Sequence, residues 1–160
     1  MARKGQTKIR QPTPDSVYQS IAISKLINST MRQGKKNAAT KQVYGALELI
    51  KKDHPKEDAL TLFEQALDNI KPKVEVRPRR IGGAVYQVPT AVRGNRQLAL
   101  ALRWLIQSSR AKSNKEFHTF AEKLASEISL ALKSEGQSIT KRQDVEKMAE
   151  ANKAFAHLRW

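Results

Sequence analysis

The 160-residue chain contains no cysteine, has few aromatic residues and carries half as many acidic as basic side chains. Without cysteine it can form neither disulfides nor thiolate metal sites. No run of apolar residues approaches the roughly 18 that a membrane-spanning helix needs, so a membrane is not an expected partner. The basic start of the chain is followed by no apolar stretch, which argues against a secretory signal. With these classes set aside, the charge is the main guide to function.

That charge is strongly positive. Lys and Arg number 30 against 15 Asp and Glu, which gives a formal net charge of +15. Hydrophobic residues make up 39% of the chain, enough for the core of one domain. A folded domain with this excess of cations favours a polyanionic partner, and nucleic acid is the first candidate.

Apolar residues recur at helical spacing in six segments. These predict helices from about 15 or 16 to 34, 36–52, 57–70, from about 95 onward, 115–133 and 141–157. Between the third and fourth helices the period changes to two, and Gly82-Gly83 separates two β-prone runs. The prediction is a mainly α fold, a six-helix domain with a protruding β-hairpin at about 73–89. Residues 14–160 are expected to form this single domain, and residues 1–13 a flexible basic N-terminal arm.

Several local features are predicted along with the helices. Asp15 or Ser16 caps the first helix, and Thr140 with Gln143 forms a capping box for the sixth. Apolar residues expected to face the core on these helices include Val17, Phe117 and Phe155, and Trp104 beside the fourth-helix stripe is also expected in the core.

Acidic residues are absent from one long stretch. Between Val76 and Lys115 there is no Asp or Glu. Arg96, Arg103 and Arg110 stand seven residues apart, which puts them on one helix face. We call these three arginines the ridge. A solvated surface normally mixes both signs of charge, so a region without carboxylates favours nucleic-acid binding.

Other residues are candidates for binding or chemistry. Tyr86 could stack on a base or pack across the hairpin. Gly82-Gly83 lacks the pattern of a phosphate-binding loop, and the chain's three histidines are far apart. Glu146 and Glu150 are expected to pair with Lys147 or Lys153 rather than to act as an acid–base couple. No enzyme activity, catalytic site, cofactor or metal is expected.

Two long runs of the chain closely resemble the bacterial-type ribosomal protein S-seven family of the small subunit. One contains Lys141-Arg142-Gln143-Asp144-Val145 and Met148-Ala149-Glu150-Ala151-Asn152-Lys153-Ala154-Phe155-Ala156-His157-Leu158-Arg159-Trp160. The other is Pro72-Lys73-Val74-Glu75-Val76-Arg77-Pro78-Arg79-Arg80-Ile81-Gly82-Gly83-Ala84-Val85-Tyr86-Gln87-Val88-Pro89. Shorter matches are Gly34-Lys35-Lys36 and Ala99-Leu100-Ala101-Leu102-Arg103-Trp104. The chain departs from the usual family pattern at Gln33, Pro78, Gly94 and Gln97.

The resemblance implies six helices with a protruding hairpin, and an RNA-binding structural role without catalysis. It implies binding to the 3′ major domain of small-subunit rRNA and nucleation of head assembly. The residues expected on rRNA are Arg3, Lys4, Lys8, Arg10, Lys35, Lys36, Lys73, Arg77, Arg79, Arg80, Arg93, Arg96, Arg103, Arg110, Lys112 and Lys115. Those expected near the exit-site tRNA are Gly82, Gly83, Tyr86, Lys147 and Lys153.

Further partners implied by the resemblance are neighbouring ribosomal proteins of the head and platform. The expected location is a bacterial cytoplasmic ribosome, or an organellar ribosome if the source is a plastid or mitochondrion. A DNA-architectural protein is the alternative, because a basic hairpin could enter a minor groove and bend the duplex. Such proteins usually need an apolar dimer surface, and six amphipathic helices look self-sufficient, so DNA is not an expected partner.

Overall fold

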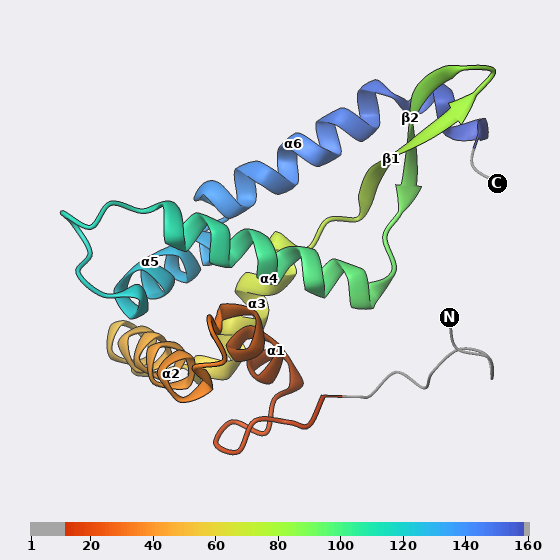
Figure 1. Ribbon diagram of the computed structural model, residues 1–160. Helices are drawn as coiled ribbons and strands as arrows, with labels where there is room; N and C mark the ends of the chain where they lie inside the picture. The colour runs from red at the N-terminus through yellow and green to blue at the C-terminus, as the bar shows by residue number, and fades with distance from the viewer. Residues whose placement is uncertain (1–11, 159–160) are drawn as a thin grey trace, which may run out of the picture.

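The computed structural model describes residues 12–158. This part of the chain forms six α-helices, one short 3-10 helix and a two-stranded antiparallel sheet between the third and fourth α-helices (Figure 1). The mainly α prediction with a hairpin in that position is confirmed. The elements are α1 Ile21–Thr30, α2 Lys36–Asp53, α3 Ala59–Ile70, β1 Val74–Ile81, β2 Ala84–Ala91, α4 Gly94–Ala111, α5 Phe120–Leu132, α6 Gln137–Ala151 and η1 Lys153–Leu158.

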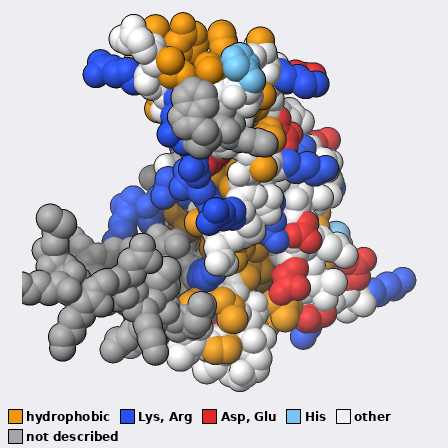
Figure 2. All heavy atoms as spheres, turned by 90° about the vertical axis from the view of Figure 1, so that its right-hand side faces the viewer, with side chains coloured by type: hydrophobic (Ala, Val, Ile, Leu, Met, Phe, Trp, Pro, Cys, Tyr) orange, Lys and Arg blue, Asp and Glu red, His pale blue; other side chains and the backbone are white. Residues whose placement is uncertain are grey.

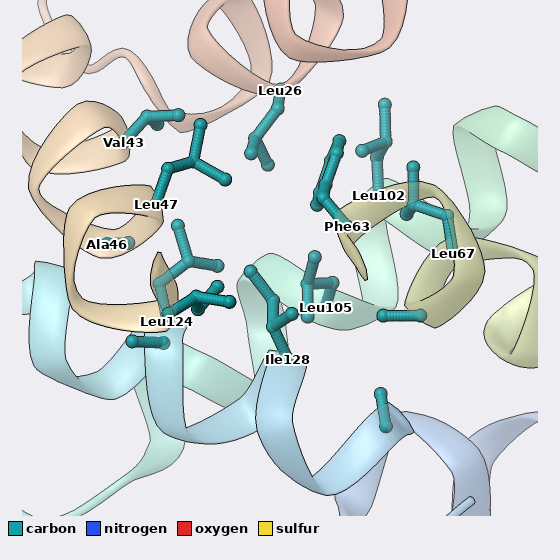
Figure 3. Close-up of a cluster of buried hydrophobic side chains, with 14 of the residues drawn as sticks. Leu26, Val43, Ala46, Leu47, Phe63, Leu67, Leu102, Leu105, Leu124 and Ile128 are labelled. Atoms are coloured by element: carbon teal, nitrogen blue, oxygen red, sulfur yellow. The ribbon is translucent and has the colours of Figure 1, made fainter. Parts of the chain in front are cut away.

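The core lies where α5 packs against α2, α3 and α4. Figure 3 shows side chains from these helices meeting there: Leu47 of α2, Phe63 of α3, Leu105 of α4, and Leu124 and Ile128 of α5. Each of these five residues is at most 1% exposed to solvent. Because a fully buried side chain of this size stabilises the fold by about 1.5–3 kcal/mol, this cluster is a main source of stability.

The hairpin projects from the helical body, and α6 extends from the body toward it (Figure 1). Strand β1 contacts α6, and β2 contacts η1. Midway along the hairpin Val88, opposite Arg77, is fully buried, whereas at the tip Ile81 pairs with Ala84. Gly82 and Gly83 connect the strands with φ of 56° and 89°. A two-residue turn with positive φ at both positions matches the twist of the strands, which is why glycine suits both sites.

The start predicted for the first helix is wrong. α1 begins at Ile21, because Asp15 closes a turn instead of capping the helix. Its carboxylate accepts hydrogen bonds from the backbone N–H groups of Val17 and Tyr18 and from the hydroxyl of Tyr44. Val17 is therefore outside the helix and 63% exposed, not a core residue.

The starts of the last two α-helices also differ from prediction. α5 begins at Phe120, where Thr119 and Glu122 form a capping box that the sequence analysis did not predict. α6 begins at Gln137, earlier than expected, and the Thr140 hydroxyl donates to the carbonyl of Gly136 instead of capping. The chain then leaves α-helical geometry after Ala151 and continues as η1.

Two phenylalanines assigned to helical core faces lie elsewhere. Phe117 precedes α5 and packs beneath the ammonium group of Lys112, 5.4 Å from the ring centre. Phe155 lies in η1 against the hairpin. Trp104 is half-buried and packs against the core, in line with its prediction.

A buried carboxylate joins α5 to the elements on either side of it. Glu127 is fully buried. Its Oε1 accepts from the backbone N–H of Ser138 at 2.9 Å and from the hydroxyl of Ser138 at 2.8 Å. Its Oε2 lies 3.2 Å from Nζ of Lys112, an ion pair without hydrogen-bond geometry. Gly136 approaches the same carboxylate with a φ of 94°, where a Cβ would lie 3.0 Å from Oε1. Glycine is therefore the residue that suits the start of α6.

Replacing Glu127 by alanine should lower the free energy of unfolding by about 3 kcal/mol, because the largely buried Lys112 ammonium loses its counter-charge and Ser138 loses its acceptor. Urea denaturation measures this. Glu135→Ala, on the exposed loop before α6, is the matched control and should change stability by no more than about 0.5 kcal/mol. Equal losses in the two variants would contradict the structural role of the buried carboxylate.

Candidate nucleic-acid interface

The acid-free stretch 76–115 forms most of the hairpin, all of α4 and the start of the loop that follows. Figure 2 shows Lys and Arg side chains gathered below the hairpin, with the Asp and Glu side chains in view concentrated toward the opposite side. The cations from this stretch that are exposed are Arg77, Arg79, Arg80, Arg93, Arg96, Arg103, Arg110 and Lys115. Folding therefore turns a run of like charge in the sequence into a surface of like charge.

Glu75, one residue before this stretch, joins the hairpin to α4. It is 6% exposed. Its carboxylate lies 2.6 Å from Nη2 of Arg77 and 2.7 Å from Nε of Arg96. Glu75 and Arg77 are two apart on β1, so their side chains share one face of the strand. Because both arginines are about half exposed, each is held by one side of its guanidinium while the rest faces solvent.

The environment of Glu75 favours its charged form. Burial raises the pKa of this carboxyl, but hydrogen bonds from Arg96 and Arg77, together with their charges, more than reverse that effect. The net result is a pKa below the ordinary value of 4.5. Glu75 therefore stays ionised wherever the protein works near neutral pH, and it orients two of the predicted RNA-binding arginines.

The ridge has different surroundings along its length. Arg96 is held by Glu75, whereas Nη2 of Arg110 donates to the backbone carbonyl of Thr30 at the end of α1, at 3.0 Å. Arg103 and Arg110 line a hollow of about 440 Å³ between α1 and α4, together with Lys25. The sequence analysis did not select Lys25, since only the packing of α1 on α4 brings it to the ridge.

The remaining predicted rRNA contacts fall into three groups. Lys35, Lys36 and Lys73 are exposed. Lys112 is largely buried. Its ammonium group pairs with Glu127 and donates to the hydroxyl of Ser126 at 2.8 Å, so it is engaged within the protein. The residues predicted on the N-terminal arm lie outside the described residues: Arg3, Lys4, Lys8 and Arg10.

The residues predicted near tRNA lie on the hairpin, α6 and η1. Gly82 and Gly83 form the exposed tip. The ring of Tyr86 lies 5.2 Å from the ring of Phe155 in η1, centre to centre. Tyr86 thus packs within the protein, against η1. Lys147 and Lys153 are exposed on α6 and η1.

The pairing predicted for Glu146 is wrong. Its carboxylate lies 3.7 Å from Nε of Arg142, one turn earlier on α6, and no contact with Lys147 or Lys153 accompanies it in the described structure. Within residues 12–158 no cluster of His, Asp or Glu has the arrangement of a metal site. Over the same residues, none of the helices has the length and apolar character required to cross a membrane.

Replacing Glu75 by glutamine should lower the free energy of unfolding by about 1 kcal/mol near neutral pH, since its partners are half exposed. Its lowered pKa means that the folded state prefers the ionised form. This stabilisation is complete above the ordinary value of 4.5 and is lost as the pH falls through the lower folded value.

The difference between wild type and Glu75→Gln should therefore shrink during an acid titration followed by urea denaturation. Glu64→Gln, exposed on α3, is the control and should show little difference at any pH. A wild-type advantage that persists unchanged in acid would mean that charge is not what holds the two arginines.

The comparisons with known proteins agree on one family. The model of the family described as "Ribosomal protein S7p/S5e" matches residues 2–153. The chain is 52% identical to the small ribosomal subunit protein uS7 of Thermodesulfovibrio yellowstonii and 51% identical to that of Thermoanaerobacter pseudethanolicus, with both chains covered in full in each case. It is 48% identical to the uS7 protein of Stenotrophomonas maltophilia, again over the full length of both. Since the family model spans nearly all of the sequence and these relatives share about half of its residues, the chain belongs to the ribosomal protein S7p/S5e family.

Proposed function

We propose that this protein binds the 3′ major domain of small-subunit ribosomal RNA through the hairpin, the ridge and the start of α2, and that it nucleates assembly of the subunit head. Family membership makes it a structural component of the small ribosomal subunit and not an enzyme. The observation that carries the RNA proposal is the folding of the acid-free stretch 76–115 into one cationic surface.

The binding mechanism has two parts. Arginine and lysine contacts with phosphates supply affinity and set the register, while the shape of a folded RNA junction supplies specificity. The guanidinium group suits this task because its planar fork can donate to two phosphate oxygens at once. The core contributes by holding the cations in a fixed array, and Glu75 orients Arg77 and Arg96 within it.

The hairpin tip and the C-terminal elements form the second part of the proposal. Gly82 and Gly83 at the tip, with Lys147 and Lys153 on α6 and η1, would lie near the exit-site tRNA. The same end of the molecule would approach neighbouring head and platform proteins. The contact of Tyr86 with Phe155 supports this grouping, because it joins the hairpin to η1. The protein's location is the ribosome of the cytoplasm, and the bacterial relatives favour this over an organellar ribosome.

Filter binding across a salt series tests the RNA proposal. The probes are a 3′-domain RNA fragment and duplex DNA of equal length. Binding to the RNA should be tighter and should survive salt better, because shape contacts add to the phosphate contacts. Equal binding to both probes, falling together with salt, would instead favour the DNA-architectural alternative.

The double variant Arg80→Gln with Arg103→Gln should weaken RNA binding and reduce the slope of log affinity against log salt by about 2, since each arginine that neutralises a phosphate adds about one to the slope. Both side chains are exposed, so circular dichroism should be unchanged. Lys51→Gln with Lys52→Gln, at the far end of α2, is the charge-matched control and should leave the slope close to wild type. An unaltered slope in the first variant would remove Arg80 and Arg103 from the interface.

Deleting residues 81–84 should spare binding to the RNA fragment while weakening retention of exit-site tRNA on reconstituted subunits. The deletion removes the tip. Arg80 and Val85, which are paired across the hairpin in the wild type, become neighbours in the chain. Retention of labelled tRNA measures the effect. Loss of RNA-fragment binding in this variant would make the tip an rRNA anchor and contradict its assignment to tRNA.

A further inference from the structure

The two faces of the hairpin have different surroundings. Glu75 of β1 lies opposite Thr90 of β2, so it shares one face with Val88 and Tyr86, which precede Thr90 at intervals of two. Glu75 and Val88 are buried on this inner face, whereas Tyr86, nearer the tip, is half-buried. On the opposite face Val85 is 58% exposed. The inner face therefore rests on the remainder of the protein, and the opposite face is presented to solvent.

The hairpin is attached to the body at its base. Glu75, near the start of β1, pairs with Arg96 of α4 at 2.7 Å. Farther along, the main contacts of the two strands with other elements are with α6 and η1. A two-stranded hairpin is only marginally stable by itself. The direction of its outer half therefore depends on α6 and η1.

The contact between Tyr86 and Phe155 supports that outer half. The ring centres lie 5.2 Å apart and the ring planes are inclined by 57°, an arrangement within the favourable range for tilted aromatic pairs. Both side chains are half-buried, and β2 is the main neighbour of η1. Figure 1 shows η1 beside the hairpin, at the end of α6 that is remote from the helical body.

Hydrogen bonds couple Phe155 to the end of α6. The backbone N–H of Phe155 donates to the carbonyl of Asn152 at 3.0 Å. Asn152 in turn donates to the carbonyl of Met148, through its backbone N–H at 3.2 Å and through its side-chain amide at 2.8 Å. The position of the Phe155 ring therefore follows the position of α6.

The other end of α6 is fixed to the helical body. Ser138 donates twice to the buried carboxylate of Glu127 on α5. Nη1 of Arg142 donates to the backbone carbonyl of Asn69 at the end of α3, at 2.5 Å. The 15 residues of α6 span about 22 Å at 1.5 Å per residue. This helix thus extends from anchors on α3 and α5 to the outer half of the hairpin.

We propose that α6 and η1 act as a brace for the hairpin, and that Phe155 and Tyr86 are positioning residues that fix the direction of its tip. Without their contact the hairpin is held at its base, and its tip can take several directions. A tip with a fixed direction loses less conformational entropy on binding, so it binds its partner more tightly. The inference rests on the proposed contact of the tip with exit-site tRNA, and it deepens that proposal by naming residues that control the contact from outside it.

Distances between two spin labels on the full chain test the brace directly. Because the chain has no cysteine, Val85→Cys near the tip and Glu64→Cys on α3 supply unique labelling sites, both at exposed positions. The distance distribution should be narrow in this labelled parent and should broaden with Phe155→Ala. Phe155→Tyr retains an aromatic ring and should restore the narrow distribution. Adding Tyr86→Ala to Phe155→Ala should broaden it no further, since the two residues act through one contact.

Met148→Ala is the matched control for this measurement. It removes another large apolar side chain from the same end of α6, where Met148 is 52% exposed, and should leave the distribution as in the parent. The Tm of Phe155→Ala should stay close to wild type, because the core between α2, α3, α4 and α5 is untouched. A distribution that remains narrow in Phe155→Ala would refute the brace. Broadening together with a large fall in Tm would mean a general loss of structure and would also overturn it.

Retention of exit-site tRNA on reconstituted subunits tests the consequence for binding. Phe155→Ala should reduce retention by roughly two- to ten-fold, the range that corresponds to the energy of one aromatic pair. Binding to the 3′-domain RNA fragment should stay like wild type, and Phe155→Tyr should restore retention. Wild-type retention in Phe155→Ala, in an assay where deletion of residues 81–84 lowers it, would refute the positioning role. If the deletion also has no effect, the proposed tRNA contact itself fails, and the label distances still decide whether the brace exists.

Discussion

The burial of the apolar face of α5 is the interaction on which the rest of the molecule depends. Leu124 and Ile128 lie on the helix that packs against α2, α3 and α4 at once, so this face joins three helices of the body to a fourth. A net charge of +15 opposes compaction through self-repulsion. The hydrophobic packing offsets that repulsion and allows the acid-free stretch to remain on one surface.

Two buried carboxylates then determine how the cationic parts meet the body. Glu75 joins β1 to the first turn of α4, and Glu127 joins the start of α6 to Lys112 in the loop after α4. Each lies at an end of α4, the helix that bears the ridge. Acidic residues are thus scarce on this side of the protein but occur where a fixed geometry is needed. The few acidic residues next to the cationic surface hold some of its basic side chains in place through ion pairs.

Sequence periodicity predicted the six helices, the hairpin and the location of the cationic stretch, because these depend on local spacing and on charge along the chain. Helix starts were predicted less well, since Asp15 and Thr140 make local hydrogen bonds that compete with capping. Phe155 was misplaced because the same apolar residue can serve a helix face or a contact with a distant hairpin. The site was found only in part: Lys25 joins it through the packing of α1 on α4, for which a single sequence carries no signal.

The contact between Tyr86 and Phe155 has a consequence for the order in which the protein matures. A chain emerges from the ribosome beginning with its N-terminal residues, and its segments fold as they are released. Phe155 is translated after all six α-helices, whereas the hairpin is made before α4. The helical body can therefore form while the hairpin still lacks the aromatic support of η1. The hairpin can therefore take the orientation that this contact gives it only after the six α-helices have been synthesised.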